Sequence, residues 1–281
     1  MVHHATDNAP GAALTSAVPP SFVCLPGAKD SPVILHVPHS AREIPAQVRT
    51  GIVLGDAELE RESDHIVDAW TAEIARDAAG GSRVRPWRFV NLLSRLVVDP
   101  ERFLDEREEM RAVGMGAVYT RTTHREVLRD DAVDPGPLVE RYFRPYARAM
   151  TEAVRERVER AGRAVVIDVH SYPSTPLPYE LHGDGARPAV CLGTDPFHTP
   201  PALLDAAETA FAGFEVGLDS PFSGTYVPLE FYGSDARVTA LMIEVRRDVY
   251  MTEPGGPAGP GLGRVARALA ALVDAVSGPR P

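Results

Sequence analysis

Histidine and carboxylate residues follow or end three aliphatic runs of the sequence, and these residue types are ligands of catalytic metals. His39 stands in HVPHS, Asp168 and His170 lie in VVIDVHS, and Glu244 lies in LMIEVRR. Side chains of a strand alternate between two faces, so Asp168 and His170 share one face. Asp168 would then hold His170 in one tautomer while the other ring nitrogen binds a metal. Two histidines and one carboxylate with an open fourth position form a catalytic zinc site.

The third ligand of such a site is not fixed by the spacing. Asp64, in RESDHIVDAW, is the preferred candidate, and Glu43 and His65 are the alternatives. His36 precedes His39 by three positions, so we expect it on the opposite strand face and interpret it as structural. A lone strand histidine is more often a hydrogen-bonded core group than a ligand, and helix-surface acids are common around Asp64.

The elements that must position these residues alternate along the chain. Strands are expected within residues 31–40, 82–103, 163–171, 187–194 and 239–251, and helices at about 56–79, 137–161, 200–213 and 262–276. Pro145 is expected to kink the second helix, and Gly162 to cap it. This alternation predicts an α/β fold: a single three-layer domain, with a mixed, mostly parallel sheet and helices on both faces. The domain is expected over residues 22–281, after a disordered lead-in at 1–21. Ligands of such sheets gather at the carboxyl ends of the strands.

Composition excludes several classes of function. The net charge of −10 argues against a nucleic-acid partner. No apolar run approaches the roughly 18 residues of a membrane helix, which argues against a membrane partner, and the first residues lack the pattern of a secretory signal. Two cysteines, Cys24 and Cys191, form no disulfide framework, which favours a cytoplasmic location. An anionic substrate would need local arginines in so acidic a chain.

Several short motifs occur together in order: VPHSAREIP, SDHIVDAW, SRLVVDPER, DVHS and IEVRRDVYM. From Val33 to Met251 this ordered set resembles the N-formylglutamate amidohydrolase family, whose fold is similar to that of zinc carboxypeptidases (phosphorylase/hydrolase-like). The resemblance implies a divalent metal, zinc or another, on three residues: His39, Asp64 and His170. It implies that Glu244 is catalytic and that Arg95 and Arg102 are the family's arginines. Two positions depart from the family pattern: Glu101 replaces an asparagine, and Ala41 a glycine.

The reaction that these residues imply is hydrolysis of a small anionic N-acyl amino acid, such as N-formyl-L-glutamate, to formate and the free amino acid. Glu244 would act as general base toward a metal-activated water; the alternative is a salt bridge with Arg246 or Arg247. Arg95 and Arg102 would bind the carboxylate, although Arg102 could instead pair locally with Glu106. Tyr226 is expected to contact substrate from the loop at 220–234, and the loop at 114–129 is a second expected cover of the site. Other readings are an amidase or carboxypeptidase acting on another N-acyl amino acid or peptide, and an inactive metal- or ligand-binding member of the family.

Overall fold

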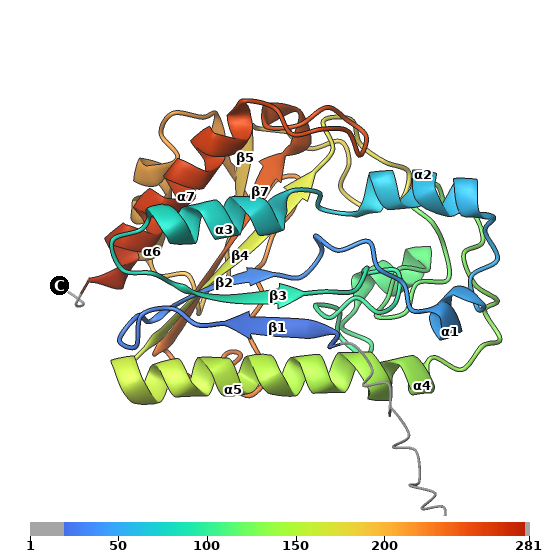
Figure 1. Cartoon of the computed structure of the whole chain (residues 1–281), viewed down its shortest axis with the longest axis horizontal. Helices are drawn as coiled ribbons and strands as arrows, with labels where there is room; N and C mark the ends of the chain where they lie inside the picture. The colour runs from blue at the N-terminus through green and yellow to red at the C-terminus, as the bar shows by residue number, and fades with distance from the viewer. Residues whose placement is uncertain (1–19, 279–281) are drawn as a thin grey trace, which may run out of the picture.

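A mixed sheet runs through the protein in the strand order β1-β3-β2-β4-β7-β5-β6, as the computed structural model of residues 20–278 shows (Figure 1). The strands are β1 (Phe22–Leu25), β2 (Val33–Val37), β3 (Trp87–Asn91), β4 (Ala164–Tyr172), β5 (Val190–Gly193), β6 (Val216–Leu218) and β7 (Val238–Arg246). β3, β2, β4 and β7 are parallel to one another. β1 is antiparallel to β3, and β5, with β6 parallel to it, is antiparallel to β7. The predicted mixed, mostly parallel sheet is confirmed.

Helices cover both faces of this sheet and complete three layers (Figure 1). One face carries α3 (Thr71–Gly81), α6 (Pro201–Ala210) and α7 (Gly261–Ser277), and the other carries α5 (Arg144–Ala161). The short helices α1 (Ala46–Arg49) and α2 (Asp56–Ile66) lie beyond the carboxyl ends of β2 and β3. α4 (Gly136–Leu138) leads through a π-helical turn at Val139–Phe143 into α5, so the helix is irregular directly before Pro145. Gly162 ends α5 in the left-handed conformation, with φ of 74°, as predicted.

The core follows the period of two along the central strands. Val33, Leu35 and Val37 pack toward the side of α3 and α7, whereas Ile34 packs toward α5. In β4, Ile167 likewise packs on the α3 side and Val166 on the α5 side. Each such aliphatic side chain contributes about 1.5–3 kcal/mol when it is fully buried. Val166, Asp168 and His170 are alternate residues of β4 and therefore point to the same face of the sheet, the face covered by α5. Packing of the aliphatic residues in the core thus determines the face on which Asp168 and His170 lie.

The helix expected from residue 56 to residue 79 is wrong in one respect, because the chain forms two helices there. α2 ends at Ile66, and α3 begins at Thr71 after Trp70, whose φ of 69° is left-handed. Ile66 and Ile74, which a continuous helix would place on one stripe, belong to different hydrophobic clusters. Residues 67–70 connect α2, which lies beyond the carboxyl ends of β2 and β3, to α3, which packs on the sheet. Asp68 belongs to this connection and therefore lies outside any helix.

Further expectations concern the N-terminal residues, the edge strands of the sheet, membrane-spanning helices and the two cysteines. Residues 1–19 of the expected lead-in lie outside the described residues, and Ser21 accepts a backbone hydrogen bond from Leu92 at 2.8 Å. The edge strands β1 and β6 were not predicted. Between residues 20 and 278, no helix combines the length and the apolar character needed to cross a membrane. Both cysteines are free thiols.

Candidate metal centre and active site

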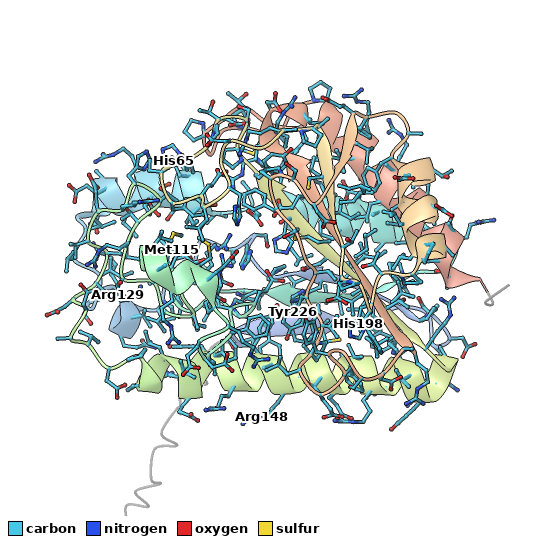
Figure 2. All side chains as sticks on the ribbon, turned by 180° about the vertical axis from the view of Figure 1, so that it is seen from behind. His65, Met115, Arg129, Arg148, His198 and Tyr226 are labelled. Atoms are coloured by element: carbon cyan, nitrogen blue, oxygen red, sulfur yellow. The ribbon has the colours of Figure 1, made fainter. Side chains whose placement is uncertain are left out.

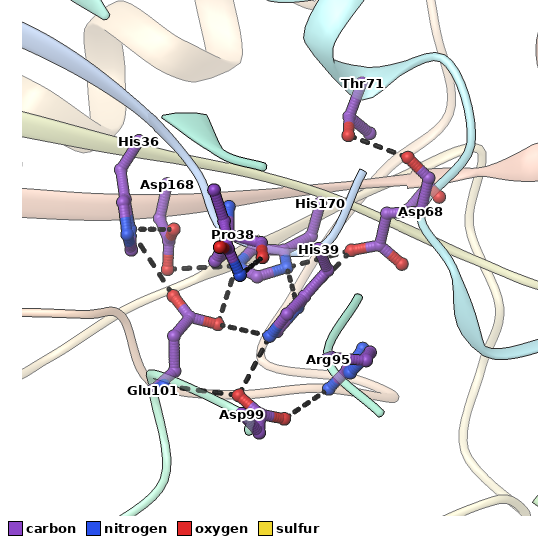
Figure 3. A network of polar contacts seen from close by, with 12 residues as sticks. His36, Pro38, His39, Asp68, Thr71, Arg95, Asp99, Glu101, Asp168 and His170 are labelled. Atoms are coloured by element: carbon purple, nitrogen blue, oxygen red, sulfur yellow. Dashed lines mark hydrogen bonds and ion pairs between the residues drawn. The ribbon is translucent and has the colours of Figure 1, made fainter. Parts of the chain in front are cut away.

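Two histidines and one aspartate converge at the carboxyl edge of the central strands (Figure 3). His39 follows β2 and His170 lies near the end of β4, and their Nδ1 atoms are 3.3 Å apart. Asp68 Oδ2 lies 3.1 Å from Nδ1 of His170 and 3.6 Å from Nδ1 of His39. All three side chains are buried. Three lone-pair donors therefore point into one small space.

The chemistry of these donors suits a divalent metal. In four-coordinate zinc with bonds of about 2.0–2.1 Å, neighbouring ligand atoms are separated by about 3.3–3.4 Å, close to the three distances in this cluster. Burial lowers the pKa of His170, but the carboxylates of Asp168 and Glu101 outweigh burial and raise that pKa well above its usual value. Burial raises the pKa of Asp68, but contacts with His170 and His39 outweigh it and hold the pKa well below its usual value. The space between the three groups thus favours a positive charge.

Carboxylates on the far side of the two rings orient them toward this space. His39 Nε2 is hydrogen-bonded to Asp99 Oδ1 at 2.9 Å. His170 Nε2 lies 3.1 Å from Asp168 Oδ2 and 3.3 Å from Glu101 Oε2, in ion-pair contact without hydrogen-bond geometry. A carboxylate at one ring nitrogen favours the tautomer that presents the other nitrogen as a ligand. Asp168 thus lies where the strand alternation predicts.

His36 of β2 lies next to Asp168 of β4, because the two residues are partners in the register of these parallel strands. Its Nδ1 is hydrogen-bonded to Asp168 Oδ1 at 2.8 Å, and its Nε2 to the hydroxyl of Tyr146 on α5 at 2.6 Å. His36 is fully buried and lies 3.4 Å from Glu101 Oε1. Although it was expected on the face opposite His39, the two histidines contact the same carboxylate side chain of Glu101.

Asp64, the third ligand expected from the sequence, is not brought to the histidines. Its Oδ1 pairs with Arg42 at 2.8 Å, and Asp68 supplies the converging carboxylate instead. The physical reason is the interruption between α2 and α3, which leaves Asp64 in the helix and releases Asp68 from it. The amide of Asp68 donates to His39 O at 3.0 Å, and Thr71 Oγ1 donates to Asp68 O at 2.7 Å. The alternatives, Glu43 and His65, are not in the cluster either.

Glu244 lies beside the cluster because β7 pairs it in register with His170 of β4. The side chain is buried, Oε2 has no hydrogen-bond partner, and burial raises the pKa of this carboxyl to about 8. The alternative salt bridge is not formed, since Arg246 pairs with Asp248 and Arg247 with Asp68. A carboxyl held close to a metal-type cluster without a fixed partner is available to move protons.

The two arginines expected as anion receptors are held by Asp99. Arg95 donates to Asp99 Oδ2 at 2.8 Å and to the hydroxyl of Tyr119 at 2.9 Å, and Arg102 Nε lies 3.3 Å from the same Oδ2. The expected alternative partner of Arg102, Glu106, is replaced by Asp99 and by Glu108 at 3.8 Å. Both arginines still line the cavity at the cluster, so each retains N–H groups for a substrate carboxylate.

Two adjoining cavities open beside the cluster. The first, of about 170 Å³, is lined by the three converging residues and Glu244, and the second, of about 420 Å³, lies behind Glu101. Tyr226, labelled in Figure 2, lines the second cavity, with its ring 4.7 Å from that of His36. Its amide donates to Asp168 Oδ2 at 3.3 Å. The loop at 114–129, expected to cover the site, supplies no residue to the lining of either cavity, but its buried Tyr119 donates to Asp99 and so supports the site from behind.

Sequence reasoning missed three residues that complete this arrangement: Asp68, Asp99 and Arg247. Arg247 donates to Asp68 Oδ1 at 3.1 Å across 179 residues of sequence, a pairing that no local spacing reveals. Asp99 and Arg95 stand four positions apart, a spacing typical of ion pairs on helices, but no helix forms there. The one available signal was the pair Asp64 and Asp68, which share a helical face in any unbroken helix.

Comparison with known proteins gives a consistent result. The model of the family described as N-formylglutamate amidohydrolase matches residues 31–251. The fold is similar to that of an N-formylglutamate amidohydrolase from Ralstonia eutropha, with a TM-score of 0.77 and 24% identity over 92% of this chain and 97% of that one. It is also similar to a gene product of Agrobacterium tumefaciens, with a TM-score of 0.67 and 18% identity over 90% and 93% of the two chains. A search of curated proteins found no match.

Proposed function

The chain belongs to the N-formylglutamate amidohydrolase family, and on this basis we propose that it is a metal-dependent hydrolase that removes the formyl group from an N-formyl amino acid. N-formyl-L-glutamate is the reference substrate, and formate and the free amino acid are the products. The observation that carries the proposal is the convergence of His39 Nδ1, His170 Nδ1 and Asp68 Oδ2 within 3.1–3.6 Å, with Glu244 in register beside His170.

His39, His170 and Asp68 are the proposed metal ligands, and zinc fits the mixture of imidazole and carboxylate donors. When bound, a divalent ion polarises the formyl carbonyl and lowers the pKa of a water molecule to about 7. Asp99 and Asp168 orient the two imidazoles, and Arg247 holds the second oxygen of Asp68. The three proposed ligands and Glu244 all line the first cavity, where a substrate amide would reach them.

Glu244 is the proposed general base and general acid. It accepts a proton from the attacking water as oxygen bonds to the formyl carbon, and it returns a proton to the nitrogen as the amide C–N bond breaks. Its pKa of about 8 reflects burial, and a neighbouring cation would favour the ionised form that a base requires. Arg95 and Arg102 line the same cavity and are the proposed receptors for the α-carboxylate of the substrate.

The experiment that tests this function combines metal analysis with a turnover assay. Purified protein should carry one divalent ion per chain and release formate from N-formyl-L-glutamate. Glu244→Gln should keep the metal and lose roughly 100-fold or more in kcat, whereas His170→Ala should lose the metal. Glu208→Gln, on the exposed side of α6, is the matched control and should behave as the wild type. Full turnover by metal-free protein would contradict the proposal, and stoichiometric metal without turnover of any N-formyl or N-acyl amino acid would indicate an inactive binding protein.

A further inference from the structure

We infer that the second cavity is a subsite for a positively charged substrate side chain, an ammonium or a guanidinium, and that Glu101 receives it. This inference rests on the proposed function and narrows its substrate class: the α-carboxylate would meet the arginines of the first cavity, and the side chain would enter the second. The second cavity, of about 420 Å³, has the size of small-molecule sites, which span about 300–1,000 Å³.

The position of the cavity suits a side-chain subsite. Five residues line both cavities, so the second cavity adjoins the one that contains the metal-type cluster and Glu244; they are Glu101, Arg102, Glu109, Ser223 and Met242. Glu101 stands at this shared wall, with Oε2 facing His170 and Oε1 directed away toward His36 (Figure 3). A substrate with its amide at the cluster could therefore extend past Glu101 into the second cavity.

The charge of the lining favours a cation. Its carboxylates outnumber its guanidiniums by six to two, and they are Glu101, Glu108, Glu109, Asp168, Asp195 and Glu230. Arg107 is paired with Asp105 at 2.7 Å, and Arg102 lies at the wall shared with the first cavity, 3.3 Å from Asp99. Among the carboxylates, Glu230 pairs with Arg155 at 2.6 Å and Asp168 contacts His36 at 2.8 Å. The excess of carboxylates in the lining would repel an anionic side chain and attract a cationic one.

Aromatic rings supply the second kind of contact that binds organic cations. Phe103, Phe143, Tyr226 and Tyr232 line the cavity. The guanidinium of Arg107 lies 4.5 Å from the centroid of the Phe103 ring, so one ring of this wall already makes a cation–π contact within the chain. Aromatic faces combined with carboxylates recognise a cation through both its charge and its apolar stem.

Three buried polar atoms of the lining residues take part in no hydrogen bond. They are Oε1 of Glu101, which lies 3.4 Å from His36 Nδ1, Oγ1 of Thr225, and Nε of Arg102, which lies 3.3 Å from Asp99 Oδ2. Buried acceptors without donors are unfavourable, and a ligand with several N–H groups would satisfy them. An ammonium offers three donors and a guanidinium five, whereas a carboxylate offers none.

The test compares kcat/KM for N-formyl-L-lysine, N-formyl-L-norleucine and N-formyl-L-glutamate with the metal-loaded enzyme. The lysine and norleucine derivatives differ by the terminal amino group, so their ratio measures recognition of charge and cancels effects on the chemical step. We expect a ratio of about tenfold or more in favour of lysine, which is the scale of one hydrogen bond to a charged group. Glu101→Gln should bring this ratio close to one, and Glu208→Gln should leave it unchanged.

Further measurements separate this inference from the proposed function. Glu109→Lys places a cation on the exposed part of the shared wall and should also lower the ratio, even if Glu101→Gln folds poorly. Calorimetric binding of N-formyl-L-lysine and N-formyl-L-norleucine tests the subsite without turnover. Equal binding of the two, or a preference that both variants leave intact, would overturn the inference. Hydrolysis of N-formyl-L-glutamate without preference for lysine would leave the proposed function standing and remove only the subsite. Preferential binding of the lysine derivative without turnover of any compound would support the subsite and contradict the proposed function.

Discussion

Replacing Asp68 with asparagine tests whether Asp68, the carboxylate that converges with the two histidines, is the proposed metal ligand, rather than Asp64, the candidate preferred from the sequence. The substitution keeps the size of the side chain and removes its charge. Oδ2 of Asp68 lies 3.1 Å and 3.6 Å from the two imidazole nitrogens, and Oδ1 accepts from Arg247. Asp64→Asn is the matched control, because Asp64 stands four positions earlier and pairs with Arg42 instead.

The expected effect on metal affinity is large. Removing an outer partner of a metal ligand costs 10–100-fold in affinity. Since Asp68 is itself one of three converging donors, we expect Asp68→Asn to cost at least about 100-fold, or about 2.8 kcal/mol at 1.4 kcal/mol per factor of ten. Arg247 keeps its contacts with Ser171 and with the carbonyl of His65, so the metal-free variant should still fold.

Competition with a chromophoric zinc chelator measures this affinity for the wild type and both variants. Thermal unfolding of the metal-free proteins, followed by circular dichroism, shows whether each variant is folded. We expect the affinity to fall for Asp68→Asn and to stay at the wild-type value for Asp64→Asn. A folded Asp68→Asn protein with wild-type affinity would refute the assignment, and so would a loss confined to Asp64→Asn.

Three further predictions concern the surroundings of the site. Asp99→Asn should weaken metal binding by about 10–100-fold through His39, measured in the same chelator competition, and unchanged affinity would remove the orienting role. Burial raises the pKa of Glu62 from 4.5 to about 7, so ionising it opposes folding and its contribution to stability is lost as pH rises from about 4.5 to 7. Urea unfolding of Glu62→Gln should therefore show a stability gain relative to wild type between pH 5 and pH 8 of up to about 3 kcal/mol; a difference independent of pH would contradict this. Ile74→Ala should lower the free energy of unfolding by about 2–5 kcal/mol, because Ile74 is fully buried in the core between α3 and the sheet; an unchanged urea midpoint would show that the site collapses without cost.

Strand periodicity made the central part of the site predictable. His170 and Glu244 come from strands whose aliphatic residues determine their face, and the structure pairs the two in register. Hydrophobic burial specifies this register strongly, because a slip of one residue would expose the core. The class of fold follows from the same regular pattern.

The interruption between α2 and α3 could not be predicted from periodicity. Ile66, Trp70 and Ile74 fit one helical stripe, yet Trp70 adopts a left-handed conformation that costs a non-glycine residue free energy. Tertiary contacts outweigh that cost, among them the hydrogen bond from the Trp70 indole to the carbonyl of Gly256 at 3.1 Å. Local spacing contains no information about a partner 186 residues away, so the choice between Asp64 and Asp68 depends on long-range packing.

The order of the strands has a consequence for when the proposed metal site can form during folding. His39 and His170 come from neighbouring strands but are 131 residues apart in sequence, and Asp68 is 102 residues from His170. Bringing them together requires closure of a long chain segment, which includes β3 and α5, and loop-closure entropy opposes this step until the sheet is paired. A nascent or fragmentary chain that ends before β4 lacks one of the three donors. The proposed metal site would therefore have its complete set of donors only after β2 and β4 have paired.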